Sequence, residues 1–241
     1  MKKPKVYILA QTELNDASDF LHEINVENYS TDTDNDAEAL IEIAGKTCYM
    51  SFNTDNNKNL TKVRSNNNQA YIKNILDVNH GSVLEHATVT FGICNVSRIF
   101  THELVRHRTG TAFSQVSGRY VRDDLKYYIP NCFTDYEKEV FTNAMKDIEY
   151  NHSVLERQVF DRLYQEGKTD FHHKKEVTSA LRRILPNGQN NTIIFTANHR
   201  AIRHIINMRI ADGAEEEIKY VFKLIKELMI KNFPNIYQDM V

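Results

Sequence analysis

Hydrophobic and polar positions along the chain alternate in blocks that predict a mixture of strands and helices. Apolar runs rich in β-branched residues predict strands at residues 3–10, 85–96, 126–130 and 190–198. Apolar residues spaced as on one face of a helix predict helices at residues 36–46, 67–79, 97–108, 134–166, 174–186, 198–212 and 214–232. The segment 134–166 is long enough for one helix or a helical pair.

Capping residues and glycines suggest where these elements end. Ser97 is a plausible N-cap for the helix that follows it, and Pro186 ends the helix before it. Gly110 and Gly118 break the segment after residue 108 into an extended loop. The chain has no internal repeat and no linker rich in proline or glycine, so we expect residues 1–241 to form a single domain.

Composition limits the class of protein. The chain has 241 residues and a net charge of −2, so we expect no general basic surface and no nucleic-acid binding. The apolar run after the first lysines is too short for a signal peptide, and no stretch is long enough to span a membrane. We therefore expect a cytoplasmic protein. Cys48, Cys94 and Cys132 are widely spaced and form no CxxC pair, so we expect buried or half-buried thiols.

The arginines are concentrated in two windows. Ten of the 13 arginines fall in residues 98–122 and 182–209, and neither window contains a lysine. Arginine without lysine is typical of planar, bidentate recognition of phosphate, carboxylate or the edge of a heterocycle. Surface pairing with carboxylates is the alternative, but Glu103 is the single acidic residue of the first window, and the second has none.

Arg209 is the most informative arginine. Helical spacing puts it among the apolar residues near Ile202 and Ile205, on the face opposite Arg203. A buried guanidinium without a partner costs several kcal/mol by order of magnitude, so it requires an anion or a set of acceptors. A structural salt bridge and a bound ligand both satisfy this requirement, and we favour the ligand.

The usual glycine-rich phosphate motifs are missing. There is no GxGxxG and no GxxxxGK[ST], so a nucleotide would be held by side chains and helix ends. The hydroxyls of Thr109, Thr111, Ser114 and Ser117 can donate hydrogen bonds to oxyanions or ring carbonyls. Three other chemistries have less support: a metal site in the segment 79–91, a Ser–His nucleophile pair using Ser117, and a cysteine nucleophile.

Taken together, these residues make the chain resemble the flavin-dependent thymidylate synthases. That family's signature is RHR, seven residues, and then S, usually followed by RY; here RHR occupies 106–108 and SGRY occupies 117–120. HGSVLEH, LRRILP and NHRAIRHIINMR support the match, in the family's order. Eight residues, not seven, separate RHR from Ser117. We place the extra one near Gly110, which leaves open whether Thr109 or Thr111 fills the usual hydroxyl position.

The resemblance implies a fold, an assembly and a site. The fold would be α+β, with a central, mostly antiparallel sheet flanked by helices and no Rossmann motif. The chain would form a homotetramer with active sites where subunits meet. FAD contacts would map to His80, Ser82, Glu85, Arg106, His107, Arg108, Asn198, Arg200 and His204. Contacts to dUMP would map to Glu103, Gln115, Ser117, Gly118, Arg119, Arg182 and Arg209. Arg119 and Arg182 would meet the phosphate, and Arg209 the pyrimidine carbonyl edge.

The implied activity is that of a methyltransferase. dUMP would be methylated at C5 to give dTMP, with methylenetetrahydrofolate as the carbon donor and reduced FAD, regenerated by NADPH, as the hydride donor. Arg209 and Ser117 are the catalytic candidates. Arg209 would stabilise negative charge developing on the ring, and Ser117 would position the substrate. No metal is expected. The rival functions are a non-catalytic nucleotide- or RNA-binding protein and a metal-dependent phosphohydrolase.

Overall fold

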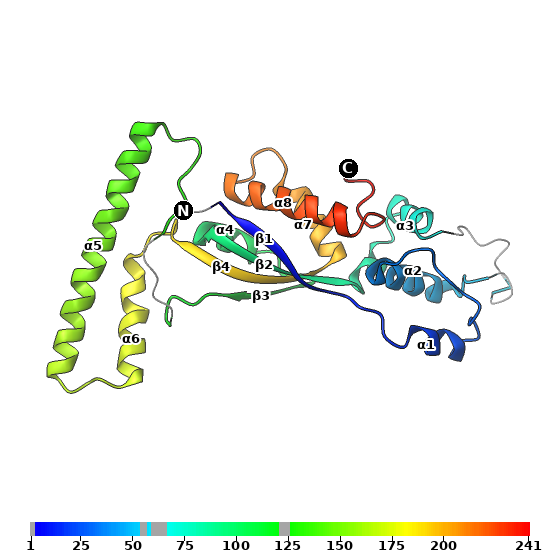
Figure 1. Cartoon of the computed structure of the whole chain (residues 1–241), viewed down its shortest axis with the longest axis horizontal. Helices are drawn as coiled ribbons and strands as arrows, with labels where there is room; N and C mark the ends of the chain where they lie inside the picture. Colours follow the sequence, from blue (N-terminus) through cyan, green and yellow to red (C-terminus); the bar gives the residue numbers. More distant parts are fainter. Residues whose placement is uncertain (1–2, 54–56, 59–66, 121–125) are drawn as a thin grey trace. The chain divides into compact units, whose positions relative to one another are not determined.

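Four antiparallel strands form the sheet of the computed structural model, which describes residues 3–53, 57–58, 67–120 and 126–241. Strands β1 (Lys5–Gln11), β2 (Thr88–Ser97), β3 (Thr111–Gln115) and β4 (Asn190–Asn198) lie in the order β1-β2-β4-β3 (Figure 1). At one end of β2, Arg98 N donates to Gln189 O, and at the other, His199 N donates to Ala87 O. Because these pairs run in opposite directions along the two strands, β2 and β4 are antiparallel.

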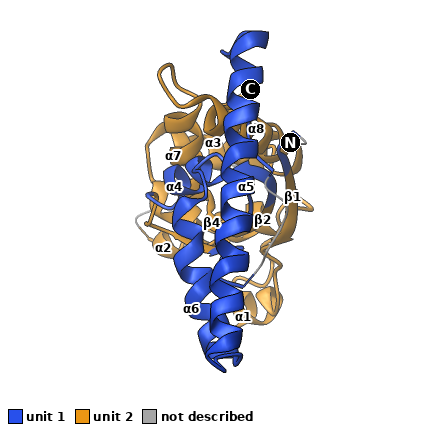
Figure 2. Ribbon diagram, turned by 90° about the vertical axis from the view of Figure 1, so that its left-hand side faces the viewer, with its two compact units in different colours: residues 1–5, 93–106, 114–194 blue, residues 6–92, 107–113, 195–241 orange. Residues whose placement is uncertain are grey.

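The chain divides into two compact units, which Figure 2 colours separately. Unit 1 contains residues 1–5, 93–106 and 114–194, and unit 2 contains residues 6–92, 107–113 and 195–241. Every strand has residues in both units, so the division coincides with no linker segment. The α+β class and the antiparallel sheet are confirmed, and the described residues show no Rossmann arrangement. That residues 1–241 form a single flavin-dependent thymidylate synthase-like domain stays a prediction.

Unit 2 holds five helices in its described residues. They are α1 (Ala17–Glu23), α2 (Asp36–Tyr49), α3 (Asn68–Asp77), α7 (His199–Arg209) and α8 (Glu216–Asn232), with a 3₁₀ turn, η1 (Gly81–Glu85). Helices α2, α3, α7 and α8 each bury several residues, whereas α1 buries only Leu21 among its described residues. Helix α2 packs against α3, and α7 packs against both α8 and η1. Phe195 of β4 stacks between Phe91 of β2 and Phe113 of β3, with ring centroids 5.8 and 5.4 Å away. This apolar packing holds the strands at the point where the loop of residues 107–110 enters β3 and where α7 follows β4.

Unit 1 holds helices α4 (Arg98–Leu104), α5 (Asp135–Gln165) and α6 (Phe171–Leu181), and the 3₁₀ turn η2 (Arg182–Ile184). Helices α5 and α6 pack side by side (Figures 1 and 2). A capping box starts α5: the Thr134 hydroxyl accepts from Glu137 N, and the Glu137 carboxylate accepts from Thr134 N. Ser97 caps α4 as predicted, because its hydroxyl accepts from Phe100 N at 3.1 Å.

Most predicted elements are present with shifted ends, and three expectations were wrong. Of the two alternatives for the segment 134–166, the structure shows the single helix. The loop predicted after residue 108 contains strand β3, and helix α1 was not predicted. The strand predicted at 126–130 is reduced to one bridge, between Tyr127 and Gln189. Cys48 and Cys132 are exposed, because they lie in the last turn of α2 and in the loop before α5, whereas Cys94 is half-buried. No described helix is long and apolar enough to cross a membrane.

Candidate functional site

Most of the residues mapped to FAD gather in unit 2. His80, Ser82 and Glu85 lie on or beside η1, and His107 and Arg108 lie in the loop before β3. The remaining unit 2 residues of this set lie on the first turns of α7: Asn198, Arg200 and His204. Helix α7 packs directly against η1, so segments more than 100 residues apart in sequence meet here. Arg106 is the member of the set that lies in unit 1, where it is exposed.

Gly110 allows the loop to approach the start of α7. Asn198 N donates to Gly110 O at 3.1 Å, and the Asn198 side chain caps α7 by accepting from Ala201 N at 2.8 Å. Gly110 has a φ of +68°, and a Cβ at this position would lie 2.5 Å from Asn198 Nδ2. A side chain would therefore meet both backbone strain and a steric clash. The glycine where we placed the extra residue of the motif is required by the geometry of the loop.

The hydroxyls beside this glycine differ in their surroundings. Thr111 Oγ1 donates to His107 O at 2.6 Å, which ties the first residue of β3 back to the RHR segment. Thr109 is exposed, whereas Thr111 is half-buried. The Thr111 hydroxyl therefore holds the shape of the loop, whereas Thr109 is exposed.

Glu85 and Arg200 form an ion pair although they lie 115 residues apart. Arg200 Nη1 donates to Glu85 Oε1 at 2.5 Å, and both side chains are about half exposed. Gly81 lies under the same guanidinium, since a Cβ there would be 3.2 Å from Arg200 Nε. The pair fixes the orientation of Arg200 above η1, and at this exposure its contribution to stability is about 0–1 kcal/mol.

His107 and Arg209 are held together by a hydrogen bond. Arg209 Nε donates to His107 Nε2 at 2.8 Å, and the His204 ring lies edge-on to the His107 ring, with centroids 6.5 Å apart. Because a guanidinium can donate but not accept, Nε2 must be the unprotonated nitrogen of His107. His107 is therefore neutral, with its proton on Nδ1, in this arrangement. The bond brings together one residue mapped to FAD and one mapped to dUMP.

The other residues mapped to dUMP lie in unit 1, and SGRY forms a tight turn there. Tyr120 N donates to Ser117 O at 3.1 Å, and Arg119 N donates to Ser117 Oγ at 3.3 Å. The Ser117 hydroxyl thus accepts a hydrogen bond within its own turn, as a residue that shapes a turn does. Gly118 has open space on its Cβ side. No described base accepts the Ser117 proton, which favours the positioning role over that of a nucleophile.

Two polar atoms of this set are buried without a partner among the described residues. They are Gln115 Nε2, at the end of β3, and Arg119 Nε, in the turn. The backbone of Arg119 is fixed by α6, since Thr178 Oγ1 donates to Arg119 O at 2.9 Å. A buried donor without an acceptor costs about 1–3 kcal/mol, so both atoms are suited to meet acceptors on a ligand.

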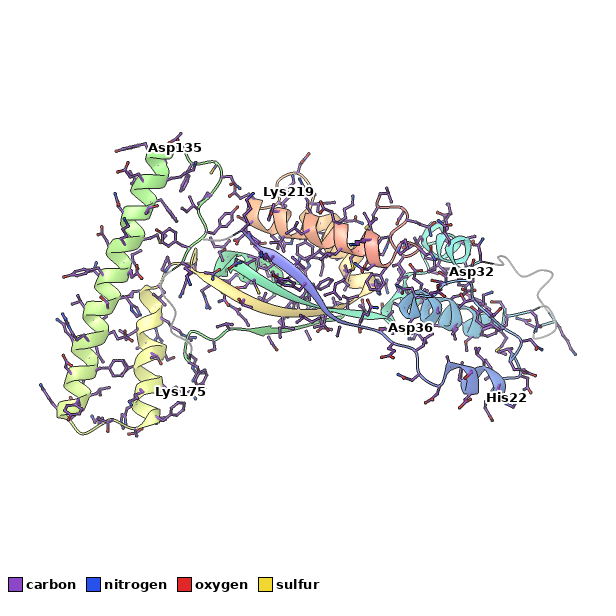
Figure 3. The ribbon with its side chains drawn as sticks, viewed as in Figure 1. His22, Asp32, Asp36, Asp135, Lys175 and Lys219 are labelled. Carbon is purple, nitrogen blue, oxygen red and sulfur yellow. The ribbon has the colours of Figure 1, made fainter. Side chains whose placement is uncertain are left out.

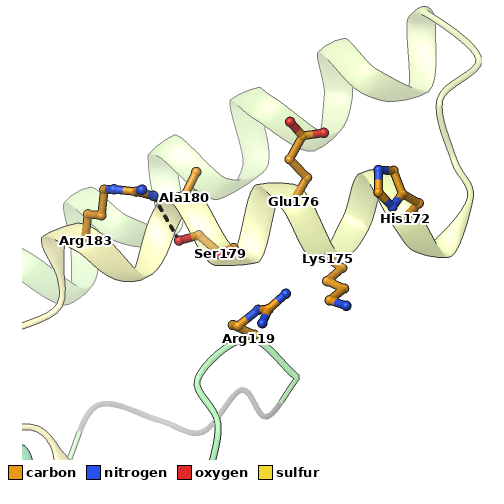
Figure 4. Close-up of a pocket in the computed structure, with 7 residues that line it drawn as sticks. All are labelled: Arg119, His172, Lys175, Glu176, Ser179, Ala180 and Arg183. Atoms are coloured by element: carbon orange, nitrogen blue, oxygen red, sulfur yellow. Dashed lines mark hydrogen bonds between the residues drawn. The ribbon is translucent and has the colours of Figure 1, made fainter.

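A basic pocket lies between Arg119 and helix α6 within unit 1 (Figure 4). Its volume is about 480 Å³, and its lining includes Arg119, His172, Lys175, Glu176, Ser179 and Arg183. Arg182, which was mapped to the phosphate, is exposed at the end of α6 and does not line this pocket. Sequence reasoning did not select the pocket residues on α6. Their three- and four-residue spacing at 172, 175, 179 and 183 is the signal that could have found them.

The remaining members of the two sets are placed as follows. Glu103 is half-buried on α4, and Arg106 is exposed just beyond the end of that helix. Arg108, His80, Ser82 and His204 are exposed in unit 2. In the described part of the chain, no three His, Cys, Asp or Glu side chains form a group suited to a metal ion.

Comparisons with known proteins agree with the resemblance. The family model described as thymidylate synthase complementing protein matches residues 30–235. A flavin-dependent thymidylate synthase of Corynebacterium diphtheriae is 35% identical over 207 residues, which cover 85% of this chain and 79% of the relative. The Mycolicibacterium vanbaalenii protein of the same name is 34% identical over 238 residues, covering 98% and 89%. The one from Mycobacterium bovis is 35% identical over 218 residues, covering 89% and 81%.

Proposed function

Because this chain belongs to the family of thymidylate synthase complementing proteins, we propose that it is a flavin-dependent thymidylate synthase that converts dUMP to dTMP. The observation that carries the proposal is the extent of the match: relatives of that name align over nearly the whole chain, including every motif quoted above. The carbon donor would be methylenetetrahydrofolate, and NADPH would regenerate the reduced FAD.

The chemistry of the donor set fits a flavin with a diphosphate. Arg106 and Arg108 are exposed and form no ion pair with a described carboxylate, so their guanidinium groups can meet phosphate oxygens. Gly81 and Gly110 let the backbone lie close to the side chains of Arg200 and Asn198, which a Cβ at either position would crowd. His80, Ser82, Glu85, His107 and His204 complete the proposed contacts. When bound, the flavin supplies the hydride that reduces the transferred carbon.

The residues of SGRY would orient the nucleotide. Gln115 Nε2 and Arg119 Nε are buried donors that lack a described acceptor, which a nucleotide would supply. Ser117 shapes the turn that presents Arg119, and Gly118 leaves room beside it. Glu103 and Arg182 complete this set. Its members stand in unit 1, except for Arg209.

Arg209 would stabilise the negative charge that develops on the pyrimidine oxygens as C5 becomes nucleophilic. The bond from Arg209 Nε to His107 fixes the guanidinium plane, so the group is oriented before substrate binds. This preorganisation is what makes an electrostatic contact effective in a transition state. We further propose that the chain forms homotetramers whose active sites draw residues from neighbouring subunits.

The test measures bound flavin and dTMP formation in the same preparation. Purified protein should carry an FAD absorbance band that NADPH bleaches, and it should form dTMP from dUMP and methylenetetrahydrofolate. Arg209→Ala should lower the dTMP rate by at least about a hundredfold, the usual cost of removing one electrostatic donor, while FAD stays bound. Arg162→Ala removes an arginine that pairs with Glu166 on the exposed face of α5, and it serves as the matched control.

The outcomes separate this function from its rivals. A colourless protein that binds RNA or nucleotides without turnover would contradict the proposal and favour the non-catalytic alternative. Loss of FAD from Arg209→Ala, together with normal dUMP affinity, would show that the arginine serves the flavin rather than the pyrimidine.

A further inference from the structure

We propose that Lys175 and Arg183 on α6, neither of which belongs to the family motifs, bind the 5′-phosphate of the nucleotide substrate together with Arg119. The inference rests on the proposed function, since it names further residues for the same substrate. All three residues line one pocket in unit 1 (Figure 4), and α6 carries two of them, with Lys175 labelled in Figure 3.

The charge of the pocket favours an anion. Arg119, Lys175 and Arg183 line it, against one carboxylate, Glu176. None of the three cations forms an ion pair with a described carboxylate, whereas Arg162, Arg200 and Arg203 elsewhere in the chain each do. In Figure 4, Lys175 and Arg119 lie on one side of the α6 ribbon, and Arg183 and Glu176 lie on the other; all of them line the pocket. A phosphate dianion would compensate the remaining positive charge.

Arg119 is placed to receive such a ligand. Its Nε is buried without a described partner, so the guanidinium lacks an acceptor on the side where water cannot supply one. Thr178 of α6 holds the backbone of Arg119 against the helix that carries Lys175 and Arg183. The turn and the helix therefore present their cations to the same space.

The Tyr120 ring lies near both Lys175 and Arg119. Lys175 Nζ lies 5.3 Å and Arg119 Cζ 5.7 Å from the ring centroid. The hydrogen bond to Lys175, and the charges of Lys175 and Arg119, lower the pKa of this exposed phenol below its usual value. Both cations lie beside the same ring, and both residues line the same pocket, so they are available to a single anionic ligand.

Arg183 is held at the other end of the pocket. Its Nη1 donates to Ser179 O at 3.2 Å, one turn earlier on α6, as the dashed line in Figure 4 shows. This bond occupies one of its five donors and leaves the others for an oxyanion. A pocket of about 480 Å³ is within the range that accommodates a small-molecule ligand such as a nucleoside monophosphate.

The experiment compares dUMP with deoxyuridine, which lacks the phosphate, as ligands of the flavin-loaded enzyme. Lys175→Met and Arg183→Gln should each raise the dissociation constant of dUMP at least about tenfold, because each removes a charge-assisted contact. Neither variant should change the affinity for deoxyuridine. The KM for dUMP should rise while kcat is retained. Lys174→Met, on the adjacent exposed position of α6, is the matched control.

Three results would overturn the proposal. The first is an unchanged dUMP affinity in both variants, and the second is a loss of deoxyuridine affinity equal to the loss of dUMP affinity. The third is a higher KM for a polyglutamylated folate with an unchanged KM for dUMP. Flavin content and melting temperature show whether each variant is folded, and either variant alone suffices for the test. If the wild-type enzyme forms no dTMP, the proposed function fails. If it does and the variants bind dUMP normally, this inference alone fails.

Discussion

The fully buried His199 should make the protein sensitive to mild acid. It is the first residue of α7, and its Nδ1 lies 3.1 Å from the Tyr237 hydroxyl. Its Nε2 is buried without a described partner, and the Phe233 ring packs edge-on against it at 4.7 Å. Burial, and secondarily the positive charge of Arg203, lower the pKa of His199 from 6.5 to about 3. The folded protein therefore holds this imidazole neutral.

The magnitude follows from proton linkage. In the unfolded chain His199 gains a proton below about pH 6.5, whereas in the folded chain it does so near pH 3. The stability that the neutral ring contributes is complete above pH 6.5 and is lost as the pH falls towards 3. The free energy of unfolding should therefore be lower at pH 5 than at pH 8 by about 2 kcal/mol, as an order-of-magnitude value.

Denaturant unfolding at a fixed protein concentration, followed by circular dichroism between pH 5 and pH 8, measures this effect. His199→Gln removes the titrating group. Between pH 8 and pH 5, the unfolding free energy of this variant should therefore fall by about 2 kcal/mol less than that of the wild type. The same substitution at the exposed His22 controls for removing an imidazole from the surface. Parallel pH profiles for the wild type and His199→Gln would refute the reasoning.

Two further predictions concern single contacts in unit 2. Gly110→Ala should lower the unfolding free energy by more than the roughly 1 kcal/mol expected for a positive φ, because the added Cβ would lie 2.5 Å from Asn198 Nδ2. Gly167→Ala, at a φ of +70° with open space around it, measures the strain alone in the same unfolding experiment, and equal losses would disprove the clash. Asp239→Asn should cost about 1 kcal/mol or less, since its carboxylate pairs with Arg203 but is about half exposed. Asp212→Asn is the matched control, because Asp212 pairs with Lys219 but is fully exposed. If both variants changed the melting temperature equally, a specific contribution from Arg203 would be contradicted.

The sequence predicted the elements whose stability is local and missed those that depend on tertiary contacts. Helices α5, α7 and α8 carry strong periodicity or capping signals. Helix α1 has seven residues, and its one buried residue, Leu21, packs with Val26, Ile43 and Phe52. Strand β3 is defined by its pairing with β4, for example from Val116 N to Thr192 O. Ile43 and Phe52 lie far from Leu21 in sequence, as β4 lies far from β3, so a local pattern could not reveal these contacts.

The candidate site shows the same limit. The motifs identified His107 and Arg209 as chemistry-bearing residues, but the hydrogen bond between them joins positions 102 residues apart. The glycine at position 110 signalled a break in the chain, whereas its close approach to Asn198 depends on where α7 begins. The basic face of α6 was visible as spacing, but its significance appears when Arg119 is placed opposite it.

Counting charges within the two arginine windows overstates the positive charge that remains after folding. The second window contains no acidic residue, and yet Arg200 pairs with Glu85, and Arg203 pairs with Asp239 and donates to Ile236 O. These carboxylates come from outside the window, so folding neutralises part of the charge that the sequence left unbalanced. An anionic ligand is therefore expected at the guanidinium groups that folding leaves without a described carboxylate. Arg119 and Arg183 meet that condition in a single pocket, which makes α6 the place where phosphate binding should be tested first.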